Sequence, residues 1–225
     1  MRRVLRIGHR GAAGHAPENT LAAIQKGIDI GVDFVEIDVR RTADGTLVVL
    51  HDETVNRTSN GKGRLDRFSL RDLQLLDAGQ GEHIPTMEEV LTVTADRAGV
   101  MLELKVPGIA RQAVEVTREF GWKVPVIYAS FLHDEMTHVR SVDPTAMVMV
   151  LFGKLPRAPV AHAMEYQTSH VGLRHDTASR RLVDEFHEQD LKVFVYTADR
   201  PRDIQRAISI GVDGVISNFP DRIGG

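Results

Sequence analysis

Three carboxylates lie at the ends of two short apolar runs of this chain. Glu36 and Asp38 are two positions apart in residues 34–39, and Glu103 lies near the end of residues 100–104. In an extended strand, side chains two positions apart share a face, so Glu36 and Asp38 project together. Carboxylates held in one direction repel each other unless a cation or a proton separates them. Their oxygens suit a hard divalent ion, Mg²⁺ or Ca²⁺, better than zinc, so we predict that these three residues bind one such cation.

Two histidines and two basic residues follow apolar runs in the same way. His9 and Arg10 follow the first run, His51 follows another, and Lys105 comes two positions after Glu103. Because an imidazole ionises at a pH of about 6.5, His9 and His51 can divide the acid and base roles near neutrality. Arg10 and Lys105 complement phosphate oxygens, Arg10 through two parallel hydrogen bonds. The set predicts a metal-assisted site for a phosphate ester, with His9 and His51 as catalytic residues.

A simpler interpretation treats these charges as solvated strand ends or as ion pairs. Glu36 could pair with Arg40, and Glu103 with Lys105. That interpretation is the better one for an isolated Glu-x-Asp on a strand. Here, separate strand ends carry charge where an apolar layer is the default, and the carboxyl ends of strands hold the catalytic residues of α/β barrels. The combination therefore favours a functional site.

Apolar runs alternate with amphipathic stretches along most of the chain. Such alternation predicts parallel strands joined by helices. The expected strands are residues 4–8, 34–39, 47–50, 100–104, 126–129, 146–151, 170–173, 192–196 and 214–217. The expected helices are residues 21–30, 109–120, 133–141, 179–189 and 201–210, with shorter ones at 69–76 and 87–94. We predict an α/β fold, a TIM (β/α)8 barrel that forms one catalytic domain over residues 1–225.

Nine expected strands are one more than such a barrel needs. Asp44-Gly45 between two extended runs is a strong signal for a two-residue β-hairpin after the second strand. With this turn, Asp38 would lie opposite His51, at the same rim of the barrel. Residues 52–95 are polar and break the alternation, so we interpret them as a small insertion beside the barrel mouth.

The composition is ordinary for a globular protein with a sizeable core. Of 225 residues, 42% are hydrophobic and 26% are charged, and the formal net charge is -3. This charge favours neither nucleic acid nor an anionic membrane as a partner, so we expect a small-molecule substrate, while the oligomeric state stays open. The absence of cysteine excludes disulfides and thiolate metal ligands. The longest apolar run, residues 146–152, is far shorter than the roughly 20 residues that span a bilayer, and residues 1–6 do not form a signal peptide, so we expect a cytoplasmic location.

The motifs named above occur together with several others in a fixed order. They are His9-Arg10-Gly11, Pro17-Glu18-Asn19-Thr20, Glu36-Ile37-Asp38-Val39, Thr42-Ala43-Asp44-Gly45 with His51-Asp52, Ile84-Pro85-Thr86, Glu103-Leu104-Lys105 and Gly211-Val212-Asp213-Gly214-Val215-Ile216. In this order and spacing the chain resembles the glycerophosphodiester phosphodiesterase family, which belongs to a barrel-shaped, phospholipase-C-like phosphodiesterase superfamily. The resemblance covers essentially the whole chain.

The resemblance implies an activity and roles for single residues. The family cleaves a glycerophosphodiester to an alcohol and glycerol 3-phosphate. Its route has the glycerol 2-hydroxyl attack phosphorus, giving a cyclic phosphate that water opens. The roles implied are an acid–base pair, two phosphate contacts and three ligands of a divalent ion, which fall on His9 and His51, on Arg10 and Lys105, and on Glu36, Asp38 and Glu103.

Three positions depart from the residues that are usual in the family. Tyr196 stands where many members have tryptophan, Asp199 where asparagine is usual, and Asn218 where aspartate is often seen. We expect these three residues to line the wall that faces the glycerol or the alcohol. The preferred head group therefore stays open.

Two other functions also stay open. A lysophospholipase D would share the chemistry and would need an apolar groove for an acyl chain. The candidate groove residues are Phe68, Leu70 and Leu73, or Leu151, Phe152 and Leu155. A non-catalytic barrel that binds phosphorylated ligands would have lost a histidine or a metal carboxylate, and none is missing here.

Overall fold

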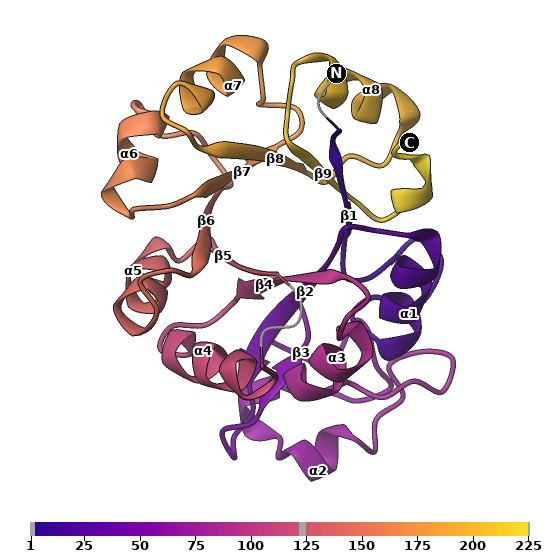
Figure 1. Ribbon diagram of the computed structural model, residues 1–225. Helices are drawn as coiled ribbons and strands as arrows, with labels where there is room; N and C mark the ends of the chain where they lie inside the picture. Colours follow the sequence, from indigo (N-terminus) through magenta and orange to yellow (C-terminus); the bar gives the residue numbers. More distant parts are fainter. Residues whose placement is uncertain (1–2, 122–124, 225) are drawn as a thin grey trace.

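The chain folds as a TIM barrel, which confirms the predicted architecture. The computed structural model describes residues 3–121 and 125–224. Among these residues, eight parallel strands form a closed ring, because β1 pairs with β9 on one side and with β2 on the other (Figure 1). The strands of the ring are β1 (Leu5–Gly8), β2 (Phe34–Arg41), β4 (Gly99–Leu104), β5 (Val126–Ser130), β6 (Met147–Phe152), β7 (His170–Arg174), β8 (Lys192–Tyr196) and β9 (Gly214–Ser217).

Helices surround this ring on the outside (Figure 1). They are α1 (Leu21–Ile30), α3 (Met87–Thr94), α4 (Ala110–Glu119), α5 (His133–Val142), α6 (Pro159–Glu165), α7 (Arg180–His187) and α8 (Pro201–Ser209), and the 3₁₀ helix η2 (Pro220–Arg222) follows β9. α6 was not predicted, because a helix of seven residues that buries only Ala163 carries almost no apolar periodicity. No helix within the described ranges has the length and the apolar character needed to cross a bilayer.

The strands alternate between the barrel interior and the helical layer. On β2, Val35, Ile37 and Val39 belong to the hydrophobic core under the helices, whereas Phe34 belongs to the cluster inside the ring. Since side chains alternate along a strand, Glu36 and Asp38 share the inner face with Phe34. The inner face thus changes from apolar to charged towards the carboxyl ends of the strands, where TIM barrels place their active sites.

The hairpin after β2 exists, but its predicted register is wrong by one residue. β3 (Leu47–Val49) runs antiparallel to β2 outside the ring, and Leu50 N donates to the carbonyl of Asp38 at 2.9 Å, so Leu50 and not His51 lies opposite Asp38. The loop has three residues and not two. Thr42 N donates to Thr46 O at 3.0 Å, and Gly45 takes the left-handed conformation that a three-residue hairpin loop requires.

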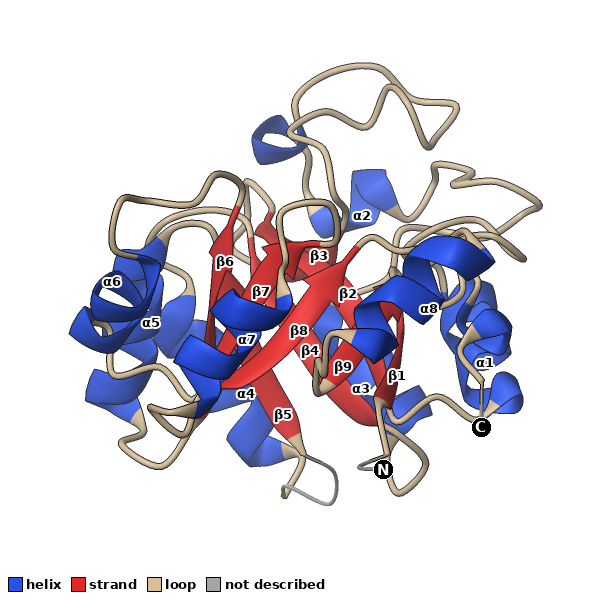
Figure 2. Cartoon of the chain, turned by 90° about the horizontal axis from the view of Figure 1, so that it is seen from above, coloured by secondary structure: helices blue, strands red, loops and turns tan. Residues whose placement is uncertain are grey.

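The segment after β3 forms a small insertion with its own apolar core. It contains the 3₁₀ helix η1 (Leu65–Arg67) and the single-turn helix α2 (Leu70–Leu73), which is shorter than the predicted helix 69–76. Figure 2 shows α2 and the adjoining loops projecting from one end of the barrel. The predicted limit of 95 is too late, because Met87, Val90 and Leu91 of α3 pack in the main core under the helices. The apolar core of the insertion is Val48, Leu50, Val55, Leu65, Leu73, Ala78 and Ile84.

Candidate active site

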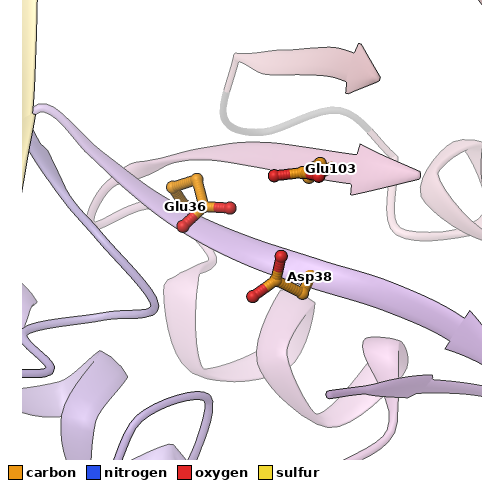
Figure 3. A group of neighbouring side chains, drawn as sticks. All are labelled: Glu36, Asp38 and Glu103. Atoms are coloured by element: carbon orange, nitrogen blue, oxygen red, sulfur yellow. The ribbon is translucent and has the colours of Figure 1, made fainter. Parts of the chain in front are cut away.

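The structure brings Glu36, Asp38 and Glu103 together at the mouth of the barrel (Figure 3). In the parallel pair β2–β4, Asp38 lies opposite Glu103, so the three side chains face the same interior space. Each side chain offers a carboxylate oxygen, and these oxygens lie within 4.8 Å of one another. Glu36 is 4% and Asp38 is 1% exposed, so water screens their mutual repulsion poorly.

Burial and neighbouring charges set the ionisation of this acidic cluster. Burial, together with the charge of Asp38, raises the pKa of Glu36 to about 8 and the pKa of Glu103 to about 7. Burial acts in the same direction on Asp38, but Lys105 and Arg10 outweigh it and hold the pKa of Asp38 below its usual value. A cation among these oxygens would favour the ionised form of all three groups. The donor set, three buried carboxylates, therefore fits one hard divalent ion such as Mg²⁺ or Ca²⁺.

Arg10 and Lys105 lie directly against the acidic cluster. The Lys105 ammonium is 2.6 Å from Glu103 Oε1 and 3.3 Å from Asp38 Oδ1. Arg10 Nη1 donates to Glu18 Oε1 at 2.6 Å. Arg10 Nε lies 3.2 Å from Asp38 Oδ2 but makes no hydrogen bond to any described residue, because the two groups are poorly aligned. Both cations are therefore within reach of an anion bound at the cluster.

His9 follows β1, and Asn218 fixes the orientation of its ring. His9 Nδ1 lies 2.7 Å from Asn218 Oδ1, and the amide nitrogen of Asn218 donates to Asp199 Oδ2 at 2.7 Å. Since that nitrogen is occupied, Asn218 presents its oxygen to His9, which assigns the proton to Nδ1 and leaves Nε2 as a base. Nε2 is 4.0 Å from Glu36 Oε2. Burial, followed by the charge of Arg10, lowers the pKa of His9 and keeps Nε2 unprotonated near neutral pH.

Asn218 and Asp199 thus lie in a different place from the one predicted. Both were expected in the wall around the organic part of the substrate, and both instead support the ring of His9. The reason is the closure of the ring, which sets β9 beside β1 and brings together residues 209 positions apart. Sequence spacing carries no signal for that contact. Only Tyr196 of the three departures lines the pocket.

His51 lies on the bend after β3, and a carboxylate fixes its orientation. His51 Nδ1 is 2.7 Å from Asp52 Oδ1, so Asp52 holds the proton on Nδ1 and leaves Nε2 available for proton transfer. Burial lowers the pKa of His51, whereas the charge of Asp38 and the hydrogen bond to Asp52 act in the opposite direction. His51 is therefore within the electrostatic reach of Asp38, although the predicted hairpin register is wrong.

An apolar pocket opens beside the acidic cluster. The Tyr196 hydroxyl donates to the carbonyl of Phe152 at 2.9 Å, and its ring meets the edge of Phe131 with 5.8 Å between the centroids. The pocket offers carbon surface for the organic part of a substrate next to charged groups for a phosphate. Its lining consists of His9, Glu36 and Glu103 with the apolar side chains Met101, Ala129, Phe131, Leu151, Tyr196 and Ile216.

The sequence model of the Glycerophosphoryl diester phosphodiesterase family matches residues 9–222. The match begins at His9 and includes every candidate site residue. The chain belongs to this family. Because the family is enzymatic, the chain is a phosphoric diester hydrolase with glycerophosphodiester phosphodiesterase activity.

Known relatives support membership of the glycerophosphoryl diester phosphodiesterase family over nearly the full length. A glycerophosphodiester phosphodiesterase of Caldanaerobacter subterraneus subsp. tengcongensis is 34% identical, over 98% of this chain and 96% of the relative. A phosphodiesterase of Oleispira antarctica, solved in complex with the product sn-glycerol-3-phosphate, superposes with a TM-score of 0.90 at 27% identity, over 96% of this chain and 94% of that chain. A glycerophosphodiester phosphodiesterase of Agrobacterium tumefaciens gives 0.87 at 28% identity, with 99% of each chain covered.

Arg57 connects the insertion of this glycerophosphoryl diester phosphodiesterase family member to both sides of the site. Its guanidinium binds Asp52 at 2.8 and 3.0 Å and Glu18 at 2.8 Å through two nitrogens. Asp52 in turn orients His51, and Glu18 binds Arg10. Sequence reasoning assigned no role to Arg57, because its two partners are 5 and 39 positions away.

Asn19 is a second residue that sequence reasoning left without a role. Its amide nitrogen donates to Asp38 Oδ2 at 2.8 Å, and its oxygen accepts from the backbone nitrogen of Asp38. Asn19 is 2% exposed and has a left-handed backbone conformation. The signal that could have found it is the Pro17-Glu18-Asn19-Thr20 motif, whose strained conformation persists only where the surroundings hold it.

The apolar residues considered for an acyl-chain groove lie mainly in hydrophobic cores. Leu73 is fully buried in the insertion core, and Phe68 and Leu70 pack against that core. Leu151 and Phe152 are 5% and 3% exposed, and only Leu155, at 37%, faces water. Most of these six residues are therefore occupied in core packing, although Leu151 also lines the apolar pocket.

Proposed function

We propose that the chain hydrolyses glycerophosphodiesters to an alcohol and glycerol 3-phosphate in a reaction that needs one divalent cation. The observation that carries this proposal is the convergence of three carboxylates, two oriented histidines and two cations at one barrel mouth. Glu36, Asp38 and Glu103 would hold the cation, which when bound would draw negative charge from the phosphate oxygens. The substrate is a small molecule, and a single catalytic domain and a cytoplasmic location remain predictions.

Arg10 and Lys105 would bind the phosphate. Both lie within 3.3 Å of Asp38. Once the carboxylates are neutralised, the Lys105 ammonium and the unbonded Nε–H of Arg10 are available to phosphate oxygens. Arg10 is well suited to this task because its left-handed backbone and the hydrogen bond from Nη1 to Glu18 already hold its side chain in place.

His9 and His51 would move the protons. His9 Nε2 takes the proton of the glycerol 2-hydroxyl as its oxygen bonds to phosphorus, and the bond from phosphorus to the alcohol oxygen breaks. Protonated His51 gives its Nε2 proton to that oxygen, which releases the alcohol. Water then opens the cyclic phosphate, with its proton passing to His51 and the proton on His9 returning to the 2-oxygen. We assign the acid role to His51 because the bond to Asp52 and the charge of Asp38 favour its protonated form and oppose the burial that lowers its pKa, whereas a neutral amide holds the more deeply buried His9.

Replacing either histidine tests the assignment. His9→Ala and His51→Ala should each lower kcat for sn-glycero-3-phosphocholine by at least about 10³-fold, since each loses one proton-transfer group in both steps. Release of choline and glycerol 3-phosphate is the readout, with circular dichroism to verify folding and His138→Ala, on the exposed face of α5, as the control. Near-wild-type turnover by either variant would overturn the proposed chemistry.

A further inference from the structure

A second, more polar groove is lined in part by Lys105, whose ammonium binds Glu103 of the apolar pocket. Arg40, Arg41 and Arg64 line it together with Lys105, and Glu53 and Asp66 contribute the opposite charge. The groove has a volume of about 350 Å³, which is in the range of small-molecule sites. The chemistry described above makes no use of its three arginines.

Arg40 continues the charged inner face of β2. It lies two positions beyond Asp38, and alternation along the strand gives both side chains the same face. The backbone nitrogen of Lys105 donates to the carbonyl of Val39 at 3.0 Å, which extends the β2–β4 pairing past Asp38 and Glu103. Arg40 and Lys105 therefore form a cationic layer one step further out than the acidic cluster.

Arg40 is a buried cation without a bound carboxylate. It is 8% exposed, and its Nε donates to the carbonyl of His51 at 2.9 Å. Among the described residues, no carboxylate lies within 4.0 Å of its guanidinium, and neither Nη makes a hydrogen bond, whereas Arg64 binds Asp66 at 2.8 Å and Glu53 at 3.0 Å. A buried guanidinium is unfavourable unless an anion pairs with it. Carboxylates such as Glu53 and Asp38 act on Arg40 only from beyond 4.0 Å, so its Nη donors are open to a bound anion.

The position of the groove relates it to one arm of the substrate. A phosphodiester has two organic arms. Glu36 and Glu103 of the acidic cluster line the apolar pocket, and Lys105, which contacts Asp38 and Glu103, lines the groove. His9 lines the apolar pocket, whereas Arg40 of the groove donates through Nε to the backbone carbonyl of His51, so the groove lies next to the segment that carries His51. The arm that takes a proton from His51 is the leaving alcohol. The groove thus lies on the side of the alcohol, and the apolar pocket lies on the side of the glycerol.

We propose that this groove binds an anionic group, a carboxylate or a phosphate, on the leaving alcohol, and that Arg40 is its principal contact. The enzyme then prefers glycerophosphodiesters whose alcohol carries a negative charge. This inference rests on the proposed function, because it assumes that a diester is cleaved at the acidic cluster. Arg41, which is exposed and bonds the carbonyl of Gly108 through Nη1, adds charge at the outer end of the groove.

Matched substrates test the preference directly. sn-Glycero-3-phosphoserine differs from sn-glycero-3-phosphoethanolamine by one carboxylate, and the ratio of their kcat/KM values is the readout. An alcohol whose negative charge comes from a phosphate is tested in the same way, by comparing glycerophosphoinositol 4-phosphate with glycerophosphoinositol. A hydrogen-bonded charge pair at Arg40 predicts a ratio of about 10 in favour of the anionic alcohol of at least one pair.

Three variants identify the residues that cause the preference, and a fourth serves as the control. Arg40→Gln should bring the ratio close to 1, and the ratio stays informative even if the lost bond to His51 slows both substrates. Arg41→Gln, which leaves His51 untouched, should lower it by about 2-fold. Glu53→Gln removes a negative charge from the groove and should raise it by about 2-fold, which general damage to the fold would not do. Arg181→Gln, on the exposed face of α7, is the control and should keep the wild-type ratio.

The outcomes separate this inference from the proposed function. Cleavage of all diesters with a ratio near 1 in the wild-type enzyme overturns the inference and leaves the function standing. A high ratio that survives both Arg40→Gln and Arg41→Gln also overturns it. Absence of cleavage for every diester in the metal-loaded protein overturns the proposed function itself, together with this inference.

Discussion

At the scale of single residues, the two histidines are oriented by different kinds of partner. Asn218 accepts from His9 Nδ1 without adding a charge, whereas Asp52 places a carboxylate on His51 Nδ1. Both acceptors raise the pKa of the ring that they hold, and burial lowers the pKa of both rings. Only Asp52 adds a full negative charge, which favours the protonated imidazole more strongly than a neutral amide does. The difference suits a base and an acid that must begin the reaction in opposite protonation states.

Removing the amide behind His9 should therefore impair catalysis without removing a reacting group. Asn218→Ala leaves Nδ1 without its acceptor and lets the ring rotate or change tautomer, so kcat should fall by about 10- to 100-fold. Steady-state kinetics with sn-glycero-3-phosphocholine provides the measurement. Asn60→Ala, which removes an acceptor from the insertion, is the matched control. Equal kcat values for the two variants would show that Asn218 does not position His9.

The raised pKa values of Glu36 and Glu103 predict that metal binding releases protons. In the metal-free protein these pKa values are about 8 and about 7, so both groups are largely protonated at pH 6.5, and a divalent ion binds only the carboxylate forms. Affinity should therefore rise between pH 6.5 and pH 8.5, with about one to two protons released per ion at the lower pH. Calorimetric titration in buffers of different ionisation enthalpy measures this number.

Two variants complete this experiment, one at a proposed metal ligand and one as the control. Glu36→Gln should weaken binding and remove one of the released protons, whereas Glu165→Gln, on the exposed side of α6, should change neither. An affinity that does not change with pH would contradict the ionisation states derived for the acidic cluster.

At the scale of elements, the barrel strands supply the carboxylates and the hairpin with its insertion supplies His51. The three-residue loop that contains Gly45 directs β3 back along β2, and the chain then leaves the hairpin at His51. Arg57 of the insertion fixes this arrangement, because its guanidinium binds the carboxylates that hold His51 and Arg10. Through Arg57, the insertion thus contributes to the site by positioning His51 and Arg10.

Loss of the Arg57 guanidinium should release both His51 and Arg10 from their fixed orientations. Arg57→Ala should lower kcat by about 10- to 100-fold, and Arg57→Lys should restore only part of it, because one ammonium cannot bind two carboxylates in parallel fashion. Added guanidinium ion should raise the rate of Arg57→Ala and not that of the wild type. Arg67→Ala, at a side chain that is 83% exposed, is the control. A thermal shift without any change in kcat would reduce Arg57 to a structural role.

Burial of His170 at the start of β7 predicts a loss of stability in acid. Burial lowers the pKa of His170 to about 4, whereas an unfolded histidine has a pKa of about 6.5. The unfolded chain therefore binds this proton first, and the contribution of His170 to stability, full above pH 6.5, is lost as the pH falls towards 4. Relative to His170→Gln, the wild-type protein should lose about 1–3 kcal/mol of unfolding free energy between pH 7 and pH 4.

Urea unfolding at several pH values measures this difference. His138→Gln, at a side chain that is 60% exposed, should follow the wild-type pH profile and serves as the control. If His170→Gln also followed the wild-type profile, the assignment of a depressed pKa to His170 would be wrong.

At the scale of the whole molecule, the sequence predicted the ring because each barrel strand carries its own apolar pattern and the motifs follow in order. Local geometry was harder to predict, since the backbone conformation of Gly45 decides the hairpin register and α6 buries a single residue. Contacts made by ring closure could not be predicted at all. Asn218 and His9 meet only because β9 pairs with β1, and no local pattern in either segment indicates that contact.

The most direct test of the account is turnover by protein stripped of metal. The stripped protein should not convert sn-glycero-3-phosphocholine, and adding Mg²⁺ or Ca²⁺ should restore formation of choline and glycerol 3-phosphate, followed by ³¹P NMR. Glu36→Gln, treated in the same way, should recover far less activity at the same ion concentration. Undiminished hydrolysis by the stripped wild-type protein would contradict the central claim that the three carboxylates bind a cation that the reaction needs.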